Sequence, residues 1–265
     1  MTTPPDLGAI LAAPSDPIRI VPLYVPEPAP SRALDGVPPA PPPRLTYRGG
    51  HLLDSVEVFT IFWGVAWQQA PQSEILSSLT SFWPFILASP LLAQLAEYNV
   101  PGHTIGPGRH TGVVTLTKPT LRHSVSDHAI QHMLQQEIAT NPAFPHPASN
   151  TLYFIYLPPG VAVVQGGGRS CQAFCGYHNA ISSQIFYAVM PYPGCAGCTA
   201  SLSVLDSLTS TSSHELCEAI TDPVPGGSWY DDVHGEIGDI CAWKTKQLGA
   251  YTIQLEWSNQ ANSCV

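Results

Sequence analysis

From residue 56 onward, short apolar runs alternate with longer stretches in which apolar residues recur every three or four positions. The short runs are typical of buried strands and the longer stretches of amphipathic helices. The pattern predicts strands at 56–62, 112–117, 152–157, 185–190 and 251–257. It predicts helices at 73–82, 90–98, 127–139 and 206–222. This alternation favours an α/β fold with a mixed, twisted sheet of about five strands and flanking helices.

The first 47 residues have a different character, because 13 of the 28 prolines lie between Pro4 and Pro43. Proline removes backbone donors and prevents regular ladders, so this segment is predicted to be an extended or disordered tail. A short apolar stretch within it, residues 18–24, could add an edge strand. The remainder, residues 48–265, is predicted to form a single α/β domain.

Composition and charge restrict the partners. Hydrophobic residues make up 44% of the chain and charged residues 11%, as in a compact, lightly charged protein. The net charge of −9 leaves no basic surface to neutralise phosphates, so nucleic acid is not an expected partner. No apolar run approaches the roughly 20 residues of a membrane helix, and no secretory signal is visible at the start.

The segment that points to chemistry lies in the helix predicted at 206–222. His214 and Glu218 are four residues apart, so both side chains project from one helix face and can reach one ion. The spacing resembles the zincin motif His-Glu-x-x-His, in which two histidines hold zinc and the glutamate is the general base. We therefore predict a zincin-like helix with His214 and Glu218 as metal ligands and Glu215 as the base.

Glu218 replaces the second histidine of the zincin motif. A carboxylate ligand adds negative charge and weakens the ion as a Lewis acid, and oxygen ligands also suit calcium or manganese. Zinc is the predicted cofactor, with calcium or manganese as the alternative. An alternative interpretation of Glu215 needs no metal, because Ser212-x-x-Glu215 matches a capping box in which Glu215 satisfies a free backbone donor.

An acidic segment follows a helix stop made by two prolines and two glycines at 223–227. It contains Asp231, Asp232, His234, Glu236 and Asp239. A zincin-like site needs a third ligand downstream of its helix, and Glu236 or Asp239 could supply it. Tyr230 or His234 could stabilise an oxyanion.

Several of these segments belong to a longer series of motifs. The series is Trp63-Gly-x-x-Trp67, Cys171-x-x-x-Cys175-Gly-x-His178, Cys195-x-x-Cys198, His214-Glu-Leu-x-Glu218 with Thr221-Asp-Pro223, and Trp229-Tyr230 with Glu236-Ile-x-Asp239 and Cys241. In this order, from about residue 56 to residue 257, the motifs resemble those of the EXORDIUM/phosphate-induced protein family, best known from plant cell walls. Asp222 and Cys217 depart from the residues that plant members usually have there.

The resemblance implies an extracellular protein linked to growth control, although the visible start of the chain leaves a cytoplasmic protein as the alternative. It carries over five site residues, namely His214, Glu215, Glu218, Glu236 and Asp239. Because the activity of the family is poorly defined, the resemblance implies a fold and a site more than a reaction.

Seven cysteines are many for a cytosolic protein. Given the secreted character that the resemblance implies, the two central groups predict at least one disulfide among Cys171, Cys175, Cys195 and Cys198, in any of three pairings. A zinc site of these four thiolates, or of three with His178, is the alternative. The odd count leaves one thiol, and Cys217 is the expected free cysteine.

The sequence leaves two functions open. The first is a metal-dependent hydrolase, a zincin-like metallopeptidase acting on a peptide or glycan substrate. The second is a non-catalytic, extracellular wall- or glycan-binding protein with a structural ion. A catalytic ion needs an open coordination position in a cleft, whereas a structural ion is enclosed by protein ligands. Trp63 and Trp67 are expected in the core, with a sugar-stacking platform as the alternative.

Overall fold

The computed structural model describes residues 20–26 and 41–265. Its main sheet has six strands in the order β1-β9-β10-β6-β3-β4. The strands are β1 (Val21–Pro22), β3 (Glu57–Trp63), β4 (Arg109–Leu116), β6 (Thr151–Tyr156), β9 (Phe174–Ile181) and β10 (Ile185–Met190). Strands β10, β6, β3 and β4 are mutually parallel, whereas β9 runs antiparallel to both β10 and β1. The predicted α/β fold with a mixed sheet is confirmed, with six strands instead of about five.

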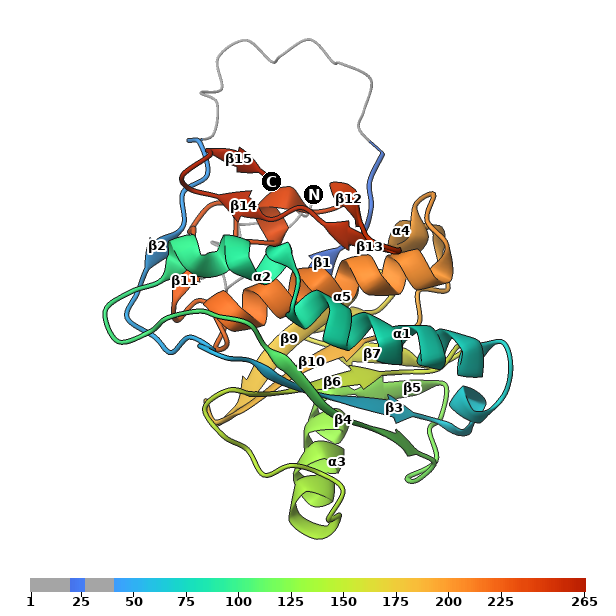
Figure 1. Cartoon of the computed structure of the whole chain (residues 1–265). Coiled ribbons are helices and arrows are strands. Elements are labelled where there is room, and N and C mark those ends of the chain that lie inside the picture. Colours follow the sequence, from blue (N-terminus) through green and yellow to red (C-terminus); the bar gives the residue numbers. More distant parts are fainter. Residues whose placement is uncertain (1–19, 27–40) are drawn as a thin grey trace, which may run out of the picture.

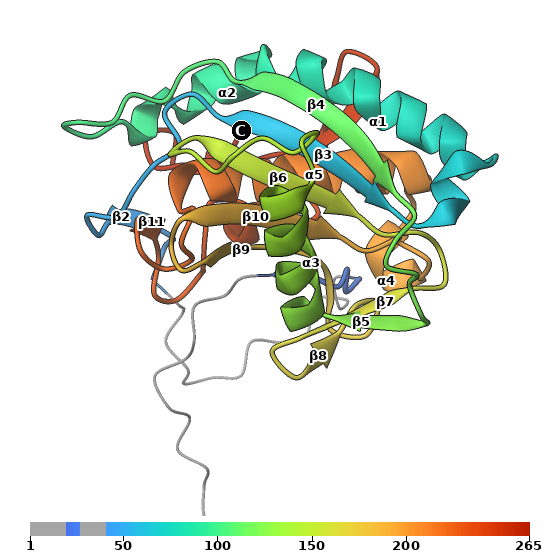
Figure 2. The ribbon, with the colours of Figure 1, turned by 90° about the horizontal axis from the view of Figure 1, so that it is seen from below.

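Helices cover both faces of this sheet. The α1, α2 and α5 helices lie on one face and α3 on the other, as two views at right angles show (Figures 1 and 2). The helical elements are η1 (Val65–Gln68), α1 (Gln72–Leu87), α2 (Pro90–Gln94), η2 (Leu95–Tyr98), α3 (Asp127–Thr140), α4 (Ala196–Thr199), α5 (Val204–Thr221) and η3 (Asp239–Cys241). All four predicted helices are present.

Alternate residues of the strands supply two cores, one on each face, as the period of two in a strand requires. Phe62 and Tyr156 belong to the core beneath α1 and α5, and Ile61 to the core beneath α3. Trp67 and Trp63 lie in these two cores and are only 1% and 2% exposed. The core interpretation of both tryptophans is therefore confirmed, and the sugar-stacking alternative is wrong.

The remaining strands form small sheets. Three of them are pairs, namely β2 (Thr46–Tyr47) with β11 (Trp229–Tyr230), β12 (Thr245–Leu248) with β13 (Tyr251–Gln254), and β14 (Trp257–Ser258) with β15 (Ser263–Cys264). A fourth sheet joins β5 (Ser124–Ser126), β7 (Ala162–Gln165) and β8 (Gly168–Arg169). The strand predicted at 251–257 thus forms as β13, but in a hairpin separate from the main sheet. The hairpin lies across α5, which separates it from the sheet (Figure 1).

Two pieces of the proline-rich start are described, residues 20–26 and 41–47. The first contains β1, which pairs with the edge of β9, so an edge strand does form within the expected stretch. The second contains β2, which pairs with β11. The rest of the predicted tail, residues 1–19 and 27–40, lies outside the described part of the chain.

Helix α5 lies between the main sheet and the C-terminal hairpins (Figure 1). Consequently every residue from Ser207 to Thr221 is buried, although many are polar. The serine and threonine hydroxyls of α5 can be buried because they form hydrogen bonds with neighbouring groups. Ser212 Oγ lies 2.8 Å from the hydroxyl of Tyr156, and Thr209 donates to the carbonyl of Thr252 at 2.7 Å. The helix can therefore hold charged side chains in a fully enclosed place.

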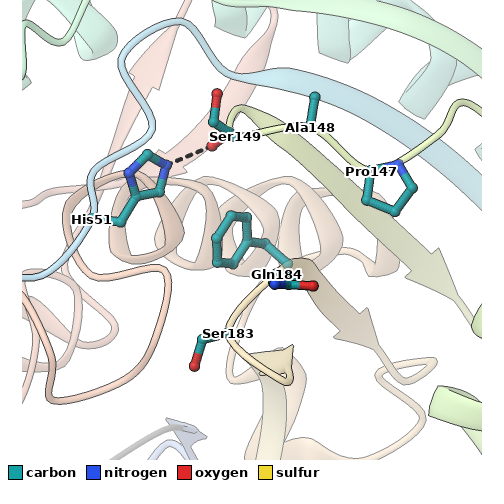
Figure 3. Close-up of a pocket in the computed structure, with 7 residues that line it drawn as sticks. His51, Pro147, Ala148, Ser149, Ser183 and Gln184 are labelled. Atoms are coloured by element: carbon teal, nitrogen blue, oxygen red, sulfur yellow. Dashed lines mark hydrogen bonds between the residues drawn. The ribbon is translucent and has the colours of Figure 1, made fainter.

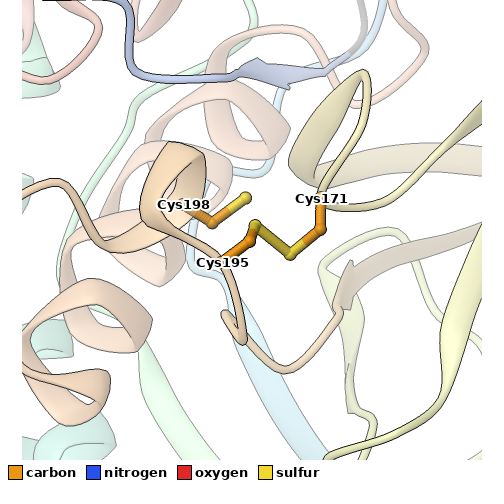
Figure 4. A group of neighbouring side chains, drawn as sticks. All are labelled: Cys171, Cys195 and Cys198. Carbon is orange, nitrogen blue, oxygen red and sulfur yellow. A yellow bond between two sulfur atoms is a disulfide. The ribbon is translucent and has the colours of Figure 1, made fainter.

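Disulfides join Cys171 to Cys195, Cys175 to Cys198, and Cys241 to Cys264. Figure 4 shows the first of these bonds with Cys198 beside it. The prediction of a disulfide among the four central cysteines is confirmed, and so is a free, buried Cys217. Because the central sulfurs are bonded to one another, the thiolate zinc site is wrong. Disulfides are typical of proteins that mature in an oxidising compartment.

No single helix in the described part of the chain is long and apolar enough to cross a membrane, although α1 with α2 and η2 reaches that length and composition as a bent pair. Trp83 and Tyr98 of this pair are 0% and 1% exposed and pack in the core, whereas Phe85 is 38% exposed.

Candidate metal centre

Three segments bring titratable side chains together on the face of the main sheet that α5 covers. Helix α5 supplies His214, Glu215 and Glu218, strand β9 supplies His178, and the segment leading into η3 supplies Glu236 and Asp239. We call these six residues the buried centre. The first five are at most 1% exposed, and the side chain of Asp239 is 5% exposed. The fold thus places four carboxylates and two imidazoles out of reach of bulk water.

His214, Glu218 and Asp239 form one group within the centre. Nε2 of His214 lies 2.9 Å from Oε1 of Glu218 and 3.9 Å from Oδ1 of Asp239. Nε2 nevertheless makes no hydrogen bond of acceptable geometry to either carboxylate. Two ligands about 2.1 Å from one ion lie about 3.0–3.4 Å apart, and the contact between His214 and Glu218 is close to that separation. One cation can therefore fit among these three side chains.

His178 organises a second group around its two ring nitrogens. Nδ1 lies 3.0 Å from Oε2 of Glu215 and 3.5 Å from Oε2 of Glu218. Nε2 lies 3.1 Å from the backbone carbonyl of Asp222 and 3.5 Å from Oε1 of Glu236. Ligand atoms of His178, Glu215 and Glu218 all fall within 4.8 Å of one another, as do those of His214, Glu218 and Asp239. Glu218 belongs to both groups.

Several polar atoms of the centre have no hydrogen-bond partner. They are both ring nitrogens of His214, Oε1 of Glu215, Oε2 of Glu218, both carboxylate oxygens of Glu236, and Oδ1 of Asp239. A buried polar atom without a partner is costly, and buried carboxylates are normally paired or coordinate metals. So many unpartnered atoms in one place fit a donor set for a cation.

The pKa values show the same excess of negative charge. Burial alone would lower the pKa of His178, but the hydrogen bond to Glu215 and the neighbouring carboxylates raise it to about 10. Burial alone would raise the pKa of Glu218, yet the two histidines lower it to about 2. Burial and the charge of Glu218 raise the pKa values of Glu236 and Asp239 well above their usual range. Without a cation, the centre can balance its charges only by retaining protons.

Two glycines let the surrounding backbone approach the centre. A Cβ atom on Gly238 would lie 2.8 Å from the His214 ring and 2.9 Å from Oε1 of Glu218. A Cβ atom on Gly176, in β9, would lie 2.7 Å from Thr211 and 3.3 Å from Oε1 of Glu215. Any side chain at either position would push the helix away from its partners.

The side chain of Asp222 fixes the turn after α5, and its backbone carbonyl thereby holds the ring of His178 in place. Its carboxylate accepts hydrogen bonds from the backbone N–H groups of Gly226, Gly227 and Ser228 at 2.6, 3.0 and 2.6 Å. The turn that results presents the Asp222 carbonyl to Nε2 of His178 at 3.1 Å. A histidine held by a backbone carbonyl through one nitrogen is the usual arrangement of a metal ligand that binds through the other.

The structure thus brings together His214, Glu218 and Asp239, with Glu215 beside them, as the sequence predicts. Glu236 is part of the centre, but it faces His178 at 3.5 Å and also interacts with the Asp222 carboxylate, and it makes no ion pair with His214. His234 bonds to Asp231 at 3.0 Å, and the guanidinium of Arg48 lies 4.5 Å over the Tyr230 ring. The roles suggested for Tyr230 and His234 therefore stay predictions.

The capping-box interpretation of Glu215 is wrong. Helix α5 begins at Val204, where the side chain of Ser203 caps the backbone N–H of Asp206. Ser212 and Glu215 therefore lie in the interior of the helix, where no backbone donor is free. The alternative of a solvated Glu218 is wrong as well, since its exposure is 0%.

The sequence pattern does not assign two residues to this region. It relates His178 only to the neighbouring cysteines, because the stretch Cys175-Gly-x-His178 does not show the alternation of a strand. Glu256, which follows β13, is fully buried with both carboxylate oxygens unpartnered. Burial raises its pKa well above the usual range. The strand predicted at 251–257 includes Glu256, but its pattern gives no signal that this carboxylate turns inward.

A separate hollow of about 370 Å³ lies where the chain enters β6 and β10 (Figure 3). His51 borders it, with Nε2 bonded to the carbonyl of Ser149 at 2.6 Å and its ring stacked on Phe186. None of the residues that line it belongs to the buried centre. A ligand in this hollow would not touch the candidate metal ligands.

No family model, curated protein or solved structure matches this chain.

Proposed function

We propose that the chain is a metal-dependent hydrolase that holds a divalent cation through His214, Glu218 and Asp239. The observation that carries the proposal is that their ligand atoms converge within 4.8 Å, while buried oxygens of the same residues lack any partner. The mixed set of one imidazole and two carboxylates suits zinc, with manganese or calcium as alternatives. When bound, the ion would supply Lewis-acid activation of a water molecule.

Glu215 is the proposed general base. It follows His214 directly, and one of its carboxylate oxygens, Oε2, is held by His178 at 3.0 Å. The other oxygen, Oε1, has no partner and is free to accept a proton from water. Burial raises the pKa of Glu215, which brings the carboxylate toward the range in which a general base works best. His178 would act as a positioning residue that orients this carboxylate.

A second candidate function rests on the enclosure of the centre. His214, Glu215, Glu218 and Glu236 are all 0% exposed, as expected for a structural ion surrounded by protein ligands. In that case the protein would be a non-catalytic wall- or glycan-binding protein, and the ion would fasten η3 to α5. The two functions differ in whether Glu215 is needed for a reaction or only for folding.

The compartment and the substrate class complete the proposal. Three disulfides support maturation in an oxidising compartment, and the resemblance to the EXORDIUM family supports an extracellular location. A peptide is the proposed substrate class, because a helix with the His-Glu pair and its glutamate as general base is the arrangement of the zincin motif. A glycan is the alternative substrate.

The experiment compares the parent protein with Glu215→Gln and His214→Ala. Metal content would be measured by elemental analysis, and hydrolysis with a peptide library and a set of wall glycans. For a hydrolase, Glu215→Gln should keep the cation held by His214, Glu218 and Asp239 and lose activity by about 10²-fold or more, whereas His214→Ala should lose both that cation and the activity. A parent that binds this cation but hydrolyses nothing, with Glu215→Gln losing the same cation, would establish the structural ion instead. A parent without metal would overturn both functions.

A further inference from the structure

We infer that the buried centre holds two divalent cations bridged by the carboxylate of Glu218. The inference rests on the proposed cation among His214, Glu218 and Asp239 and adds a second one, among His178, Glu215 and Glu218. In this arrangement Oε1 of Glu218 serves the first ion and Oε2 the second. Two-metal sites in hydrolytic enzymes place their ions about 3.5–4 Å apart, a span that one bridging carboxylate can cover.

The first argument is that the two oxygens of Glu218 face different histidines. Oε1 lies 2.9 Å from Nε2 of His214, and Oε2 lies 3.5 Å from Nδ1 of His178. Oε2 has no hydrogen-bond partner even though the side chain is 0% exposed. A carboxylate with one histidine near each oxygen, both buried, is arranged as a bridge between two sites.

The second argument comes from the orientation of His178. Its Nε2 lies 3.1 Å from the carbonyl of Asp222, which can only accept, so Nε2 carries the proton of the neutral ring. Nδ1 then presents a lone pair to Oε2 of Glu215 at 3.0 Å. Two lone pairs cannot face each other at this distance without a cation or an extra proton between them. In the metal-free centre a second ring proton can occupy this place and donate to Glu215, and a divalent cation would replace it while also binding Oε2 of Glu218.

The third argument is the balance of charge. The centre contains four carboxylates and two imidazoles, and among the described residues no lysine or arginine pairs with it, since the pairs that these side chains make are Arg48 with Asp232 and Arg109 with Glu57. With all four carboxylates ionised and both imidazoles neutral, one divalent cation leaves two negative charges in a buried place. Two divalent cations balance these six residues, and the buried carboxylates of Asp222 and Glu256 next to the centre add negative charge, so a single cation compensates the centre even less well.

The test is the number of ions that the whole protein binds. Manganese would be titrated into the metal-free protein and counted by equilibrium dialysis with elemental analysis. We expect two equivalents, together with the exchange-coupled electron paramagnetic resonance spectrum of two manganese ions that share a ligand. His178→Gln should lose one equivalent and the coupling, whereas Glu218→Gln should lose both ions. His128→Ala, on the exposed side of α3, is the matched control and should keep two.

The number of bound ions decides between two cations, one cation and none. One equivalent with the six-line spectrum of an isolated ion would overturn the second site while leaving the proposed function intact, and would assign an extra proton to His178. Binding of no manganese, zinc or calcium would refute the proposed function itself. Circular dichroism would establish that each variant is folded, and if His178→Gln does not fold, the count in the parent protein still decides between one ion and two.

Discussion

Nδ1 of His178 lies 3.0 Å from Oε2 of Glu215, so strand β9 and helix α5 meet through two fully buried polar side chains. This contact fixes the rotation of the helix relative to the sheet. It also places the neighbouring residues His214 and Glu218 toward Asp239, which the segment after β11 brings from the other side.

Removal of metal should destabilise the protein. A ligand present at 100 times its dissociation constant stabilises the folded state by about 2.7 kcal/mol. For a domain of this size that corresponds to a fall of about 5–10 °C in melting temperature when a chelator is added. Differential scanning calorimetry with and without chelator measures it. Glu218→Gln, which removes the residue shared by both ligand groups, should not respond to the chelator, and superimposed curves for the parent protein would contradict the prediction.

Gly238→Ala should weaken metal binding for steric reasons alone. Its backbone has φ −79° and ψ −38°, which alanine adopts easily, but the new Cβ would lie 2.8 Å from the His214 ring. Overpacking of this kind costs about 1–3 kcal/mol, or about 5- to 150-fold in affinity if it falls on the bound state. Competition with a chelating dye measures the affinity. Gly194→Ala is the control, because its Cβ would meet nothing closer than 3.9 Å. Equal affinities in the two variants would be evidence against the close packing.

Asp222→Ala should destabilise the fold far more than removal of an exposed carboxylate. Asp222 is 0% exposed and accepts three backbone hydrogen bonds, and each bond to a charged group contributes about 1.5–3 kcal/mol. We expect a loss of about 3 kcal/mol or more in the free energy of unfolding by urea. The control is Asp232→Ala, which removes an exposed ion pair with Arg48 worth at most about 1 kcal/mol. Similar losses in both variants would show that the turn does not depend on Asp222.

The disulfide between Cys241 and Cys264 should support the metal centre, because Cys241 ends the η3 turn that begins at Asp239. Replacing both cysteines by serine should cost about 3 kcal/mol and also lower metal affinity. Replacing Cys171 and Cys195 opens a loop of nearly equal length, 24 residues instead of 23, away from Asp239. That pair should lose similar stability and keep its affinity. The prediction is wrong if both double variants bind metal equally well.

Sequence patterns predicted the elements whose apolar spacing is regular. The strands that became β3, β4, β6 and β10 and the four helices are in place, because hydrophobic burial selects one face of each element. Strand β9 was missed because it is buried on both faces and carries Gly176 and His178 where a half-exposed strand would alternate. Its partner β10 follows after a turn of only three residues, so the hairpin itself is local, and what hid β9 was the lack of alternation within it.

The candidate centre likewise contains residues whose position the sequence pattern predicts and residues whose position it does not predict. The spacing of His214 and Glu218 follows from the helical repeat, so their common face was predictable, as was the inward turn of Asp239 after a helix stop. The place of His178 beside Glu215 depends on how closely β9 approaches α5, and the small residue at Gly176 controls this distance. Tertiary packing of this kind has no signature in a single segment.

The enclosure of α5 between the sheet and the C-terminal hairpins has a consequence for biosynthesis. A nascent chain that has emerged only as far as residue 230 already contains His178, His214, Glu215 and Glu218, but the outer face of α5 is then open to water. Asp239, and the hairpin of β12 and β13 that covers the helix, leave the ribosome later. The proposed cation is therefore expected to enter late in maturation, and the acidic helix stays hydrated until the final hairpins close over it.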